Sequence, residues 1–278
     1  MPTHKRARPD AARDAGDRLK LHRRRMHADG RDYTVITLRP DAGARFSTNR
    51  YHDTWHVLSD VYGARLMGRL LWGLSFQRRP GTLIVIDRQH LTPNPFDAAP
   101  ADPVMLVSAH LTTLTPRAAR RLVAPLPSEG TVRWHTWGLD AEVARLRGPA
   151  AWDWEPLADT RGAAVERVGG ALVLRAPPTR LREWAANVAR LGDDLHGRMD
   201  YVALQTTRYW SSWAIDGEMQ IFSDYRQRVA VARVARREVL AGLPAPRVPA
   251  EVEPIIWEHA GAVRSRRHPA VASRRSGA

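Results

Sequence analysis

Cysteine is absent from this chain of 278 residues. Its absence excludes a disulfide framework, a cysteine-ligated metal and a thiol nucleophile. Long apolar runs are also absent: the most apolar segment carries Arg65 and Arg69, so no stretch of about 20 residues could form a membrane span. Residues 1–31 lack the apolar stretch that a secretory signal requires. Together with 44% apolar residues, these absences predict a cytoplasmic globular protein without a membrane partner.

Three common catalytic motifs are missing as well. The chain has no G-x-x-x-x-G-K-[ST] loop, which excludes a P-loop nucleotidase. No G-x-G-x-x-G follows a predicted strand, so a dinucleotide-binding fold has no support. The G-x-S-x-G elbow of the α/β-hydrolases is absent too. The sequence therefore assigns no cofactor.

Lysine is nearly absent, since only Lys5 and Lys20 accompany 41 arginines. The net charge of +14 is concentrated at the ends: residues 1–31 contribute +6, residues 262–278 contribute +5, and +3 remains for the rest. Both ends are polar and poor in apolar residues, which predicts disordered basic tails. Such tails can hold phosphate backbones in a salt-dependent way. An arginine bias of this kind also follows from GC-rich coding DNA, and that origin carries no function.

Strands and helices alternate between these tails. In the first half, β-branched and apolar runs predict strands at 33–38, 82–87, 104–109 and 131–137. Helical periodicity predicts a long helix that begins within 47–54 and ends at 76, and two shorter helices over 115–124 and 140–147. Gly63, Gly68 and Gly73 interrupt the long helix. They indicate either close packing of another backbone or a bend.

The second half repeats this order with clearer turns. Gly169-Gly170 and Asp216-Gly217 are two-residue hairpin signals between apolar runs. Helices are predicted over 179–196 and 224–241, with a strand at 200–204 between them. Residues 252–257 read as a last strand, which Pro254 restricts to a sheet edge.

Both halves can be read as β-α-β-β-α-β, the order of a split-βαβ or ferredoxin-like lobe. The sequence thus predicts an α+β protein, with tandem ferredoxin-like lobes at 32–148 and 164–260, a connector at 149–163, and basic tails at 1–31 and 261–278. A single α+β domain with the same order of elements remains an equal alternative. A doubly wound α/β sheet is also open, although the two hairpins argue against a wholly parallel sheet.

Two histidines lie four residues apart in His52-Asp53-Thr54-Trp55-His56. On a helix they would share one face, as in the H-E-x-x-H zinc motif. The hypothesis is a metal site on His52 and His56. The alternative is a polar helix entrance in which Asp53 favours the first turn.

The tripeptide His-Leu-Thr occurs twice, at His90–Thr92 and at His110–Thr112. The pair resembles the two His-x-Thr motifs of phosphoesterases built on paired ferredoxin-like lobes. That resemblance implies an imidazole base, an imidazole acid and phosphate-binding hydroxyls, which would be His90, His110, Thr92 and Thr112. The family has one motif in each lobe, whereas here both lie in the first half. The histidines could share one phosphate only if strands 82–87 and 104–109 were parallel.

Aromatic residues alternate with arginine in the second half. A segment rich in both types precedes the Asp216-Gly217 turn, and it contains Arg208, Tyr209, Trp210 and Trp213. On the helix that follows, Arg226, Arg233 and Arg237 lie within about 20° of one line at 100° per residue. Such a surface could stack bases and contact phosphates. The alternative is a solvated helix face with tryptophans that fill a core or a subunit contact.

These patterns allow several functions and force none. The preferred hypothesis is a non-catalytic protein that binds nucleic acid, DNA included, through its tails, the arginine stripe and the aromatic hairpin. The second is a phosphoesterase that uses His90 and His110, or a metal-dependent hydrolase that uses His52 and His56. The third is a structural protein whose Trp-rich hairpin contacts another subunit, as in a homo-oligomer.

Overall fold

The computed structural model describes residues 19–125, 127–147, 160–193, 195, 197–204, 206, 216–244 and 248–267. The chain forms two compact units. Unit 1 comprises residues 1–91 and 102–223, and unit 2 comprises residues 92–101 and 224–278. Unit 2 is therefore assembled from the C-terminal part of the chain and a short internal loop.

Seven strands of the described residues form the larger sheet of unit 1, in the order β7-β1-β2-β5-β6-β9-β8. Two neighbouring pairs, β2 with β5 and β6 with β9, are parallel, and the others are antiparallel. The bounds are β7 Gly130–Arg133, β1 Lys20–Ala28, β2 Arg31–Thr37, β5 Thr82–Ile86, β6 Val104–Ser108, β9 Ala171–Ala176 and β8 Ala164–Val168.

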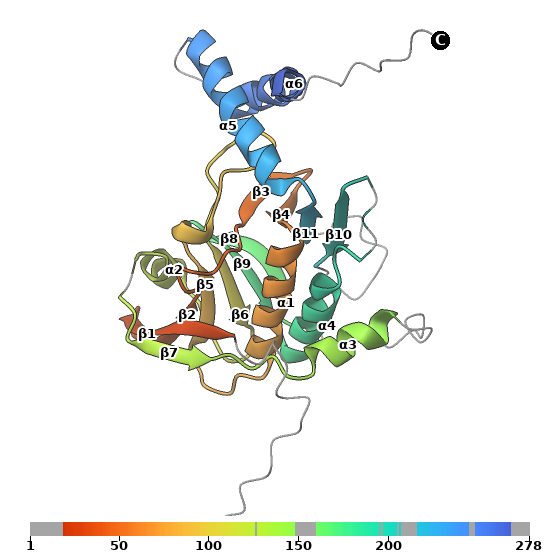
Figure 1. Cartoon of the computed structure of the whole chain (residues 1–278). Coiled ribbons are helices and arrows are strands. Elements are labelled where there is room, and N and C mark those ends of the chain that lie inside the picture. Colours follow the sequence, from red (N-terminus) through yellow and green to blue (C-terminus); the bar gives the residue numbers. More distant parts are fainter. Residues whose placement is uncertain are drawn as a thin grey trace, which may run out of the picture. The chain divides into compact units, whose positions relative to one another are not determined.

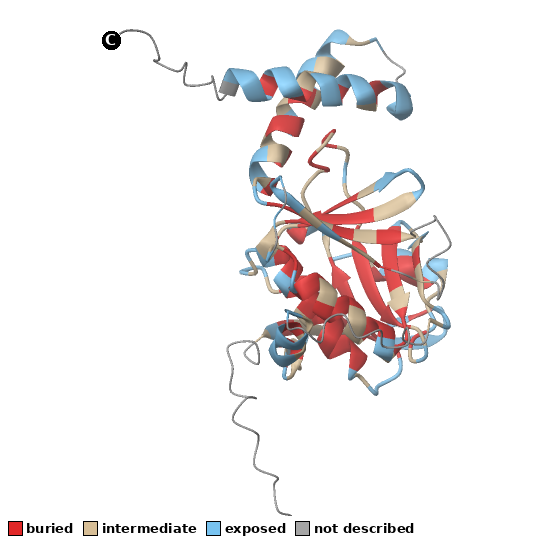
Figure 2. Cartoon of the chain, turned by 90° about the vertical axis from the view of Figure 1, so that its right-hand side faces the viewer, coloured by how far each residue is buried: buried red, intermediate tan, exposed pale blue. Residues whose placement is uncertain are grey.

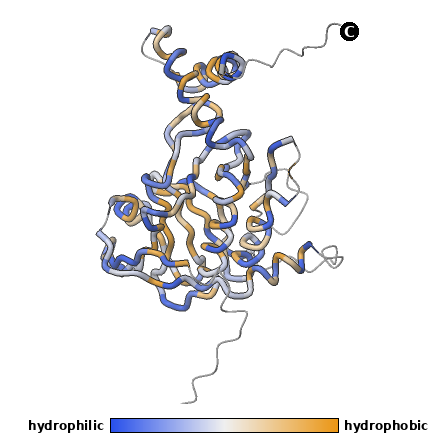
Figure 3. Tube along the Cα trace, viewed as in Figure 1, coloured by the Kyte–Doolittle hydropathy of each residue, from blue (hydrophilic) through white to orange (hydrophobic). Residues whose placement is uncertain are grey.

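The central strands are apolar on both faces, because both faces are covered. Ile84 of β5, Leu106 of β6 and Leu174 of β9 point into one hydrophobic cluster. Their neighbours Val85 and Met105 point into another on the opposite side. The hydrophobic residues of these strands are the orange stretches at the centre of the sheet in Figure 3.

Helices cover the two faces unequally. α1 (Val61–Ser75) and α4 (Pro178–Ala189) pack side by side on one face, and α3 (Leu139–Arg147) contacts α4 (Figure 1). α2 (Pro116–Leu122) packs on the other face. At the start of this helix, which was predicted over 115–124, Thr115 caps α2 by accepting from the Ala118 N–H at 3.1 Å, and Pro116 takes the first helical position.

A second sheet of four described strands has the order β10-β11-β4-β3. The strands are β10 (Met199–Ala203), β11 (Gly217–Phe222), β4 (Thr54–Ser59) and β3 (Ser47–Tyr51). β11 is parallel to β4 and the outer pairs are antiparallel. Val57, Met219 and Ile221 point from its inner face into the same hydrophobic cluster as α1 and α4.

The prediction that the long helix begins within 47–54 is wrong. Residues 47–59 form the β3–β4 hairpin instead, and α1 begins at Val61. His52 and Asp53 form the turn with φ of 47° and 63°, the left-handed pair that a tight hairpin requires. The helix start is set by Asp60, whose carboxylate accepts from the Gly63 N–H at 2.8 Å.

Close packing, rather than a bend, explains the α1 glycines. A Cβ on Gly68 would lie 2.7 Å from both the Ala185 carbonyl oxygen and the Ala189 Cβ of α4. A Cβ on Gly73 would lie 2.2 Å from the Trp134 indole nitrogen. α1 can therefore lie against α4 because Gly68 lacks a side chain, and Gly73 leaves room for the Trp134 indole. The buried faces of both helices are visible in Figure 2.

The basic ends are more ordered than predicted. Residues 20–28, assigned to a disordered tail, form β1 inside the larger sheet. Of the +6 assigned to residues 1–31, +4 belongs to residues 20–31. The remaining tail residues, 1–18 and 268–278, lie outside the described residues.

Unit 2 is built around two helices, α5 (Tyr225–Gly242) and α6 (Pro249–Arg267). The predicted edge strand at 252–257 is wrong, because this stretch is part of α6 and Pro254 lies inside the helix. Four apolar residues of α6 follow one another at intervals of four or three residues, so they share one face of the helix. This face packs against Val231 and Ala235 of α5. These four are Val252, Ile256, Ala260 and Val263.

The loop Thr92–Ala101 completes unit 2. Its Phe96 ring lies against Trp257 of α6 with 6.5 Å between ring centroids. Arg236 of α5 donates to the Asp97 carbonyl oxygen at 3.1 Å. A hydrogen bond within the loop also stabilises it, since the Asp97 carboxylate accepts from the Ala99 N–H at 2.6 Å.

The α+β class is confirmed, with two mixed sheets. Tandem ferredoxin-like lobes are not confirmed: strands from before and after residues 149–163 belong to one sheet, joined by the β6–β9 pair. The Gly169-Gly170 hairpin is confirmed, with φ of 59° and 85° at the two glycines. Within the described ranges, no helix has both the length and the apolar character needed to cross a membrane.

Gly68→Ala tests the α1–α4 contact. The new Cβ would overpack the interface, and we expect the free energy of unfolding to fall by about 1–3 kcal/mol. Gly261→Ala is the control, because Gly261 lies inside α6 and a Cβ added there would have nothing within 4 Å. That substitution should be neutral or stabilise by up to about 1 kcal/mol. Denaturant unfolding followed by circular dichroism measures both, and equal effects would contradict the proposed contact.

Candidate nucleic-acid interface

The arginine stripe of α5 is exposed along its length. Arg226, Arg233 and Arg237 are all exposed, while Val231 and Ala235 are buried against α6. At 100° per residue, Val231 and Ala235 lie about 140° and 180° from Arg226. Packing of the apolar face therefore directs the stripe to solvent. Arg233 and Arg237 form no ion pair with any residue that the structure describes.

The other arginines of α5 have partners within unit 2. Arg228 donates to the Asp224 carboxylate at 2.6 Å, one turn earlier on the helix. Arg236 donates to the Asp97 carbonyl oxygen of the loop. These two side chains stabilise the unit, whereas Arg233 and Arg237 face outward without an ion pair to a described residue.

The one acidic residue of α5, Glu238, is engaged by α6. Its carboxylate lies 2.6 Å from His259 Nε2 and 2.6 Å from Arg266 Nη2. Hydrogen bonds from His259 and Arg266 lower the pKa of Glu238. Glu238 lies about 120° around the helix from Arg226, so it does not neutralise the stripe.

The aromatic residues predicted to stack bases, Tyr209, Trp210 and Trp213, lie outside the described residues. Arg208 lies outside them too. The segment that holds them joins β10 to β11, which pair antiparallel. Thr206 and Asp216, on either side of it, are hydrogen-bonded through their side chains. The base-stacking hypothesis therefore stays a prediction.

His52 and His56 do not share a helix face. His52 is an exposed turn residue, whereas His56 is buried in β4. Direct pairing of His56 with Glu218 in the parallel β4–β11 ladder brings their side chains to 3.4 Å. The hydrogen bond from His56 lowers the pKa of Glu218. Sequence reasoning missed this pair, because nothing local in either strand indicates that they are neighbours.

The helical basis of the metal hypothesis is thus removed. In the part of the chain that the structure describes, no three histidine or acidic side chains converge as a metal site would require.

His90 and His110 lie at opposite ends of β5, because β5 and β6 pair antiparallel. His90 closes the short 3₁₀ helix Arg88–His90 after the strand. His110 lies next to Leu111, whose carbonyl accepts from the Gly81 N–H just before the strand, at 3.1 Å. The separation is roughly the length of β5, about 13 Å at 3.3 Å per residue. The parallel pairing that the phosphoesterase mechanism requires is not present.

The two threonines of the repeated tripeptide have structural hydrogen bonds. Thr112 is buried and donates to the Thr82 carbonyl oxygen at 3.0 Å. The Thr92 hydroxyl lies 2.7 Å from the Tyr225 hydroxyl inside unit 2. The two hydroxyl groups therefore belong to different units of the chain.

His90 is fully buried, with an exposed fraction of 0%. Its main-chain carbonyl accepts from the Phe46 N–H at 2.9 Å, and its Nε2 lies 3.0 Å from the Gln89 amide nitrogen. Burial is the main cause that lowers the pKa of His90, and it outweighs the charge of Asp87, which acts in the opposite direction. His90 is thus a neutral core residue that helps to fix the chain after β5.

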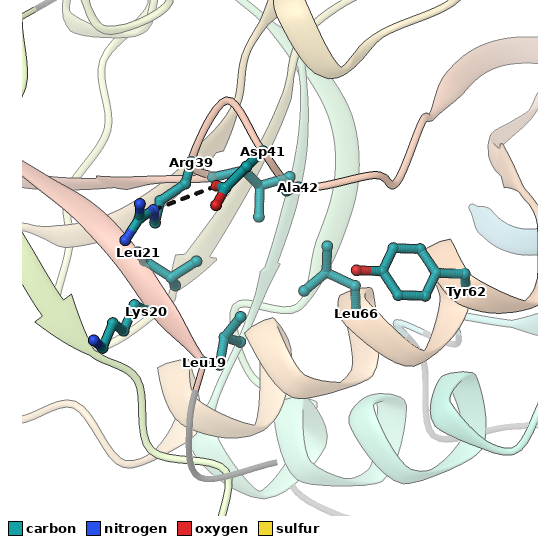
Figure 4. A pocket seen from close by; sticks show the side chains of 9 residues that line it. Leu19, Lys20, Leu21, Arg39, Asp41, Ala42, Tyr62 and Leu66 are labelled. Carbon is teal, nitrogen blue, oxygen red and sulfur yellow. Dashed lines mark ion pairs between the residues drawn. The ribbon is translucent and has the colours of Figure 1, made fainter. Parts of the chain in front are cut away.

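A cavity of about 300 Å³ opens in unit 1 between the start of β1 and the first turns of α1 (Figure 4). Leucines form much of its wall, and the Tyr62 side chain lies at one side with its hydroxyl directed toward the cavity. Lys20 and Arg39 supply positive charge at its border, and Arg39 pairs with Asp41 at 3.3 Å. None of the catalytic, metal-binding or nucleic-acid-binding residues predicted from the sequence lines this cavity.

A cavity of about 380 Å³ in unit 2 is more apolar. It lies between the Ala99-Pro100 part of the loop and α5 and α6. Glu253 is at its border, and burial together with the negative charge of Asp97 raises the pKa of Glu253. The stripe residues do not line it.

Comparison of the chain with protein-family models, with curated proteins and with solved structures finds no match. Function must therefore be inferred from the residues themselves.

The buried His90 predicts a pH-dependent stability. Because its pKa is lowered in the folded protein, the unfolded state binds the proton more readily as the pH falls below about 6.5. The free energy of unfolding should therefore fall with pH in that range. In His90→Gln this contribution is lost, so the difference in stability between wild type and variant should shrink on acidification. Denaturant titrations at about pH 5 and pH 7.5 measure it, and a constant difference would contradict the prediction.

Proposed function

We propose that this protein binds nucleic acid without catalysing a reaction, and that the exposed stripe Arg226, Arg233 and Arg237 contacts the phosphate backbone. The observation that carries the proposal is the outward direction of this stripe, opposite the buried face of α5. Guanidinium groups are well suited to phosphate, because they offer several donors in a planar arrangement and keep their charge.

The charge of the whole chain supports the same partner. A net charge of +14 attracts a polyanion over a distance and accelerates its association. Within unit 2, the ion pairs and hydrogen bonds of Glu238 and Asp224 are directed to His259, Arg266 and Arg228 and not to Arg233 or Arg237. Arg233 and Arg237 therefore keep their positive charge for a partner.

Arg233→Gln/Arg237→Gln tests the proposal. For mixed-sequence duplex DNA, the loss of two phosphate contacts should reduce the slope of log K against log salt by about 2. Binding should weaken uniformly across sequences, since backbone contacts carry no sequence information. Fluorescence anisotropy between about 50 and 200 mM salt measures the slope.

Arg117→Gln/Arg120→Gln is the matched control. Both arginines are exposed on α2 in unit 1, and the substitution removes the same charge. The control should keep the wild-type slope. A wild-type protein that binds no nucleic acid at low salt would overturn the proposal, and equal losses in the two variants would show that only net charge matters.

A further inference from the structure

The cavity beside Tyr62 lies next to the strongest run of positive charge in unit 1. β1 begins at Lys20, which borders the cavity, and continues through Arg23-Arg24-Arg25. Leu21 points to the α1 side of the sheet and also lines the cavity. Since side chains alternate along a strand, Arg23 and Arg25 point to this same side.

The two arginines therefore continue a line that starts at the cavity. Along β1, Leu21, Arg23 and Arg25 follow one another at about 6.6 Å. Arg25 is exposed and Arg23 is half-buried. Neither forms an ion pair with a described residue, and the Nε of Arg23 is buried without a hydrogen-bond partner among those residues.

α1 contributes further charge around Tyr62. Arg65 and Arg69 follow Tyr62 by three and seven residues, which places them within about 60° of it on the helix surface. Arg65 is exposed. Because no acidic residue occurs in α1, this face of the helix is wholly cationic.

Tyr62 itself is 54% exposed, although it borders an apolar wall of Leu21, Leu38 and Leu66. β7 pairs only with Lys20–Arg23 of β1, so arginines later in the strand have the simpler role of preventing pairing with another chain. That role explains the charge in this part of β1, but it explains neither the exposed ring of Tyr62 nor the cavity beside it. An aromatic ring next to an apolar hollow and a cationic track is the arrangement that holds a base and its phosphates.

We infer that this surface, defined by Lys20, Arg23, Arg25, Tyr62 and Arg65, binds single-stranded nucleic acid. A base stacks on the exposed ring face of Tyr62 at the border of the cavity, while the adjoining phosphates contact the arginines of β1 and α1. Duplex DNA does not use the cavity, because its bases are paired and stacked within the helix. The inference rests on the proposed function and adds to it a second site, in unit 1, with a preference for unpaired strands.

The first test is Tyr62→Leu, which keeps the apolar side chain and removes the aromatic face. Affinity for a single-stranded DNA of about 12 nucleotides should fall between about fivefold and a hundredfold, whereas affinity for a duplex of the same length should not change. Tyr62→Phe keeps the ring and should bind as wild type does. Because Tyr62 is half-exposed, these changes leave the core of unit 1 intact.

The second test is Arg23→Gln/Arg25→Gln/Arg65→Gln. The salt slope for the single strand should fall by about 2, at roughly 0.7 for each lost phosphate contact. Arg117→Gln/Arg120→Gln/Arg121→Gln removes the same charge from α2, on the opposite face of the sheet, and should leave the slope unchanged. Circular dichroism establishes that both variants are folded.

The outcomes separate the two proposals. Suppose that the wild type binds nucleic acid but Tyr62→Leu binds the single strand as tightly as the wild type does. The site in unit 1 is then wrong and the proposed function stands. The same conclusion follows if the α2 triple variant loses as much of the salt slope as Arg23→Gln/Arg25→Gln/Arg65→Gln. Equal losses for duplex and single strand would likewise overturn the base-binding role of the cavity. If the wild type binds neither strand form but binds vesicles of anionic phospholipid, both proposals fail.

Discussion

The parallel pairing of β6 with β9 is the contact on which unit 1 depends. It aligns Val104–Ser108 with Leu172–Ala176 and so joins the first half of the chain to the second. Both strands are apolar on both faces, and each face needs a cover. α1 and α4 provide one cover together, which is possible because Gly68 lets α1 approach the backbone of α4 at Ala185. One shared core, rather than one core for each half, is the result.

The same arrangement decides where the charge lies. Residues 20–31 were predicted to belong to a basic tail, yet β1 pairs with β2 over seven residues and fixes three successive arginines in the second strand of the sheet. A fixed arginine loses less entropy on binding a phosphate than one in a disordered segment. The arginines of β1 and the exposed arginines of α5 thereby have fixed positions, and substitutions in each set can be compared with substitutions of the α2 arginines.

The histidine motifs show how far local patterns extend. His52 and His56 have the spacing of a helical pair, but a left-handed turn at His52 and Asp53 makes them parts of a hairpin. His90 and His110 share a tripeptide, but antiparallel pairing of β5 and β6 separates them. His56 does contact a carboxylate, but that carboxylate belongs to Glu218, a residue far away in the chain. Spacing alone contains no information on strand direction.

Local chemistry determined much of the secondary structure. The capped start of α2 at Thr115-Pro116, the Gly169-Gly170 turn and the apolar strands β5, β6 and β9 follow from short-range rules, as does the exposed stripe of α5. The tertiary structure decided which strands pair, that residues 252–257 continue a helix, and that β1 is ordered. It also placed Tyr62 at one cavity with Lys20 and Leu21, the first residues of β1. These outcomes depend on which apolar faces cover one another, and such long-range packing overrides local propensity because burial contributes more free energy than propensity does.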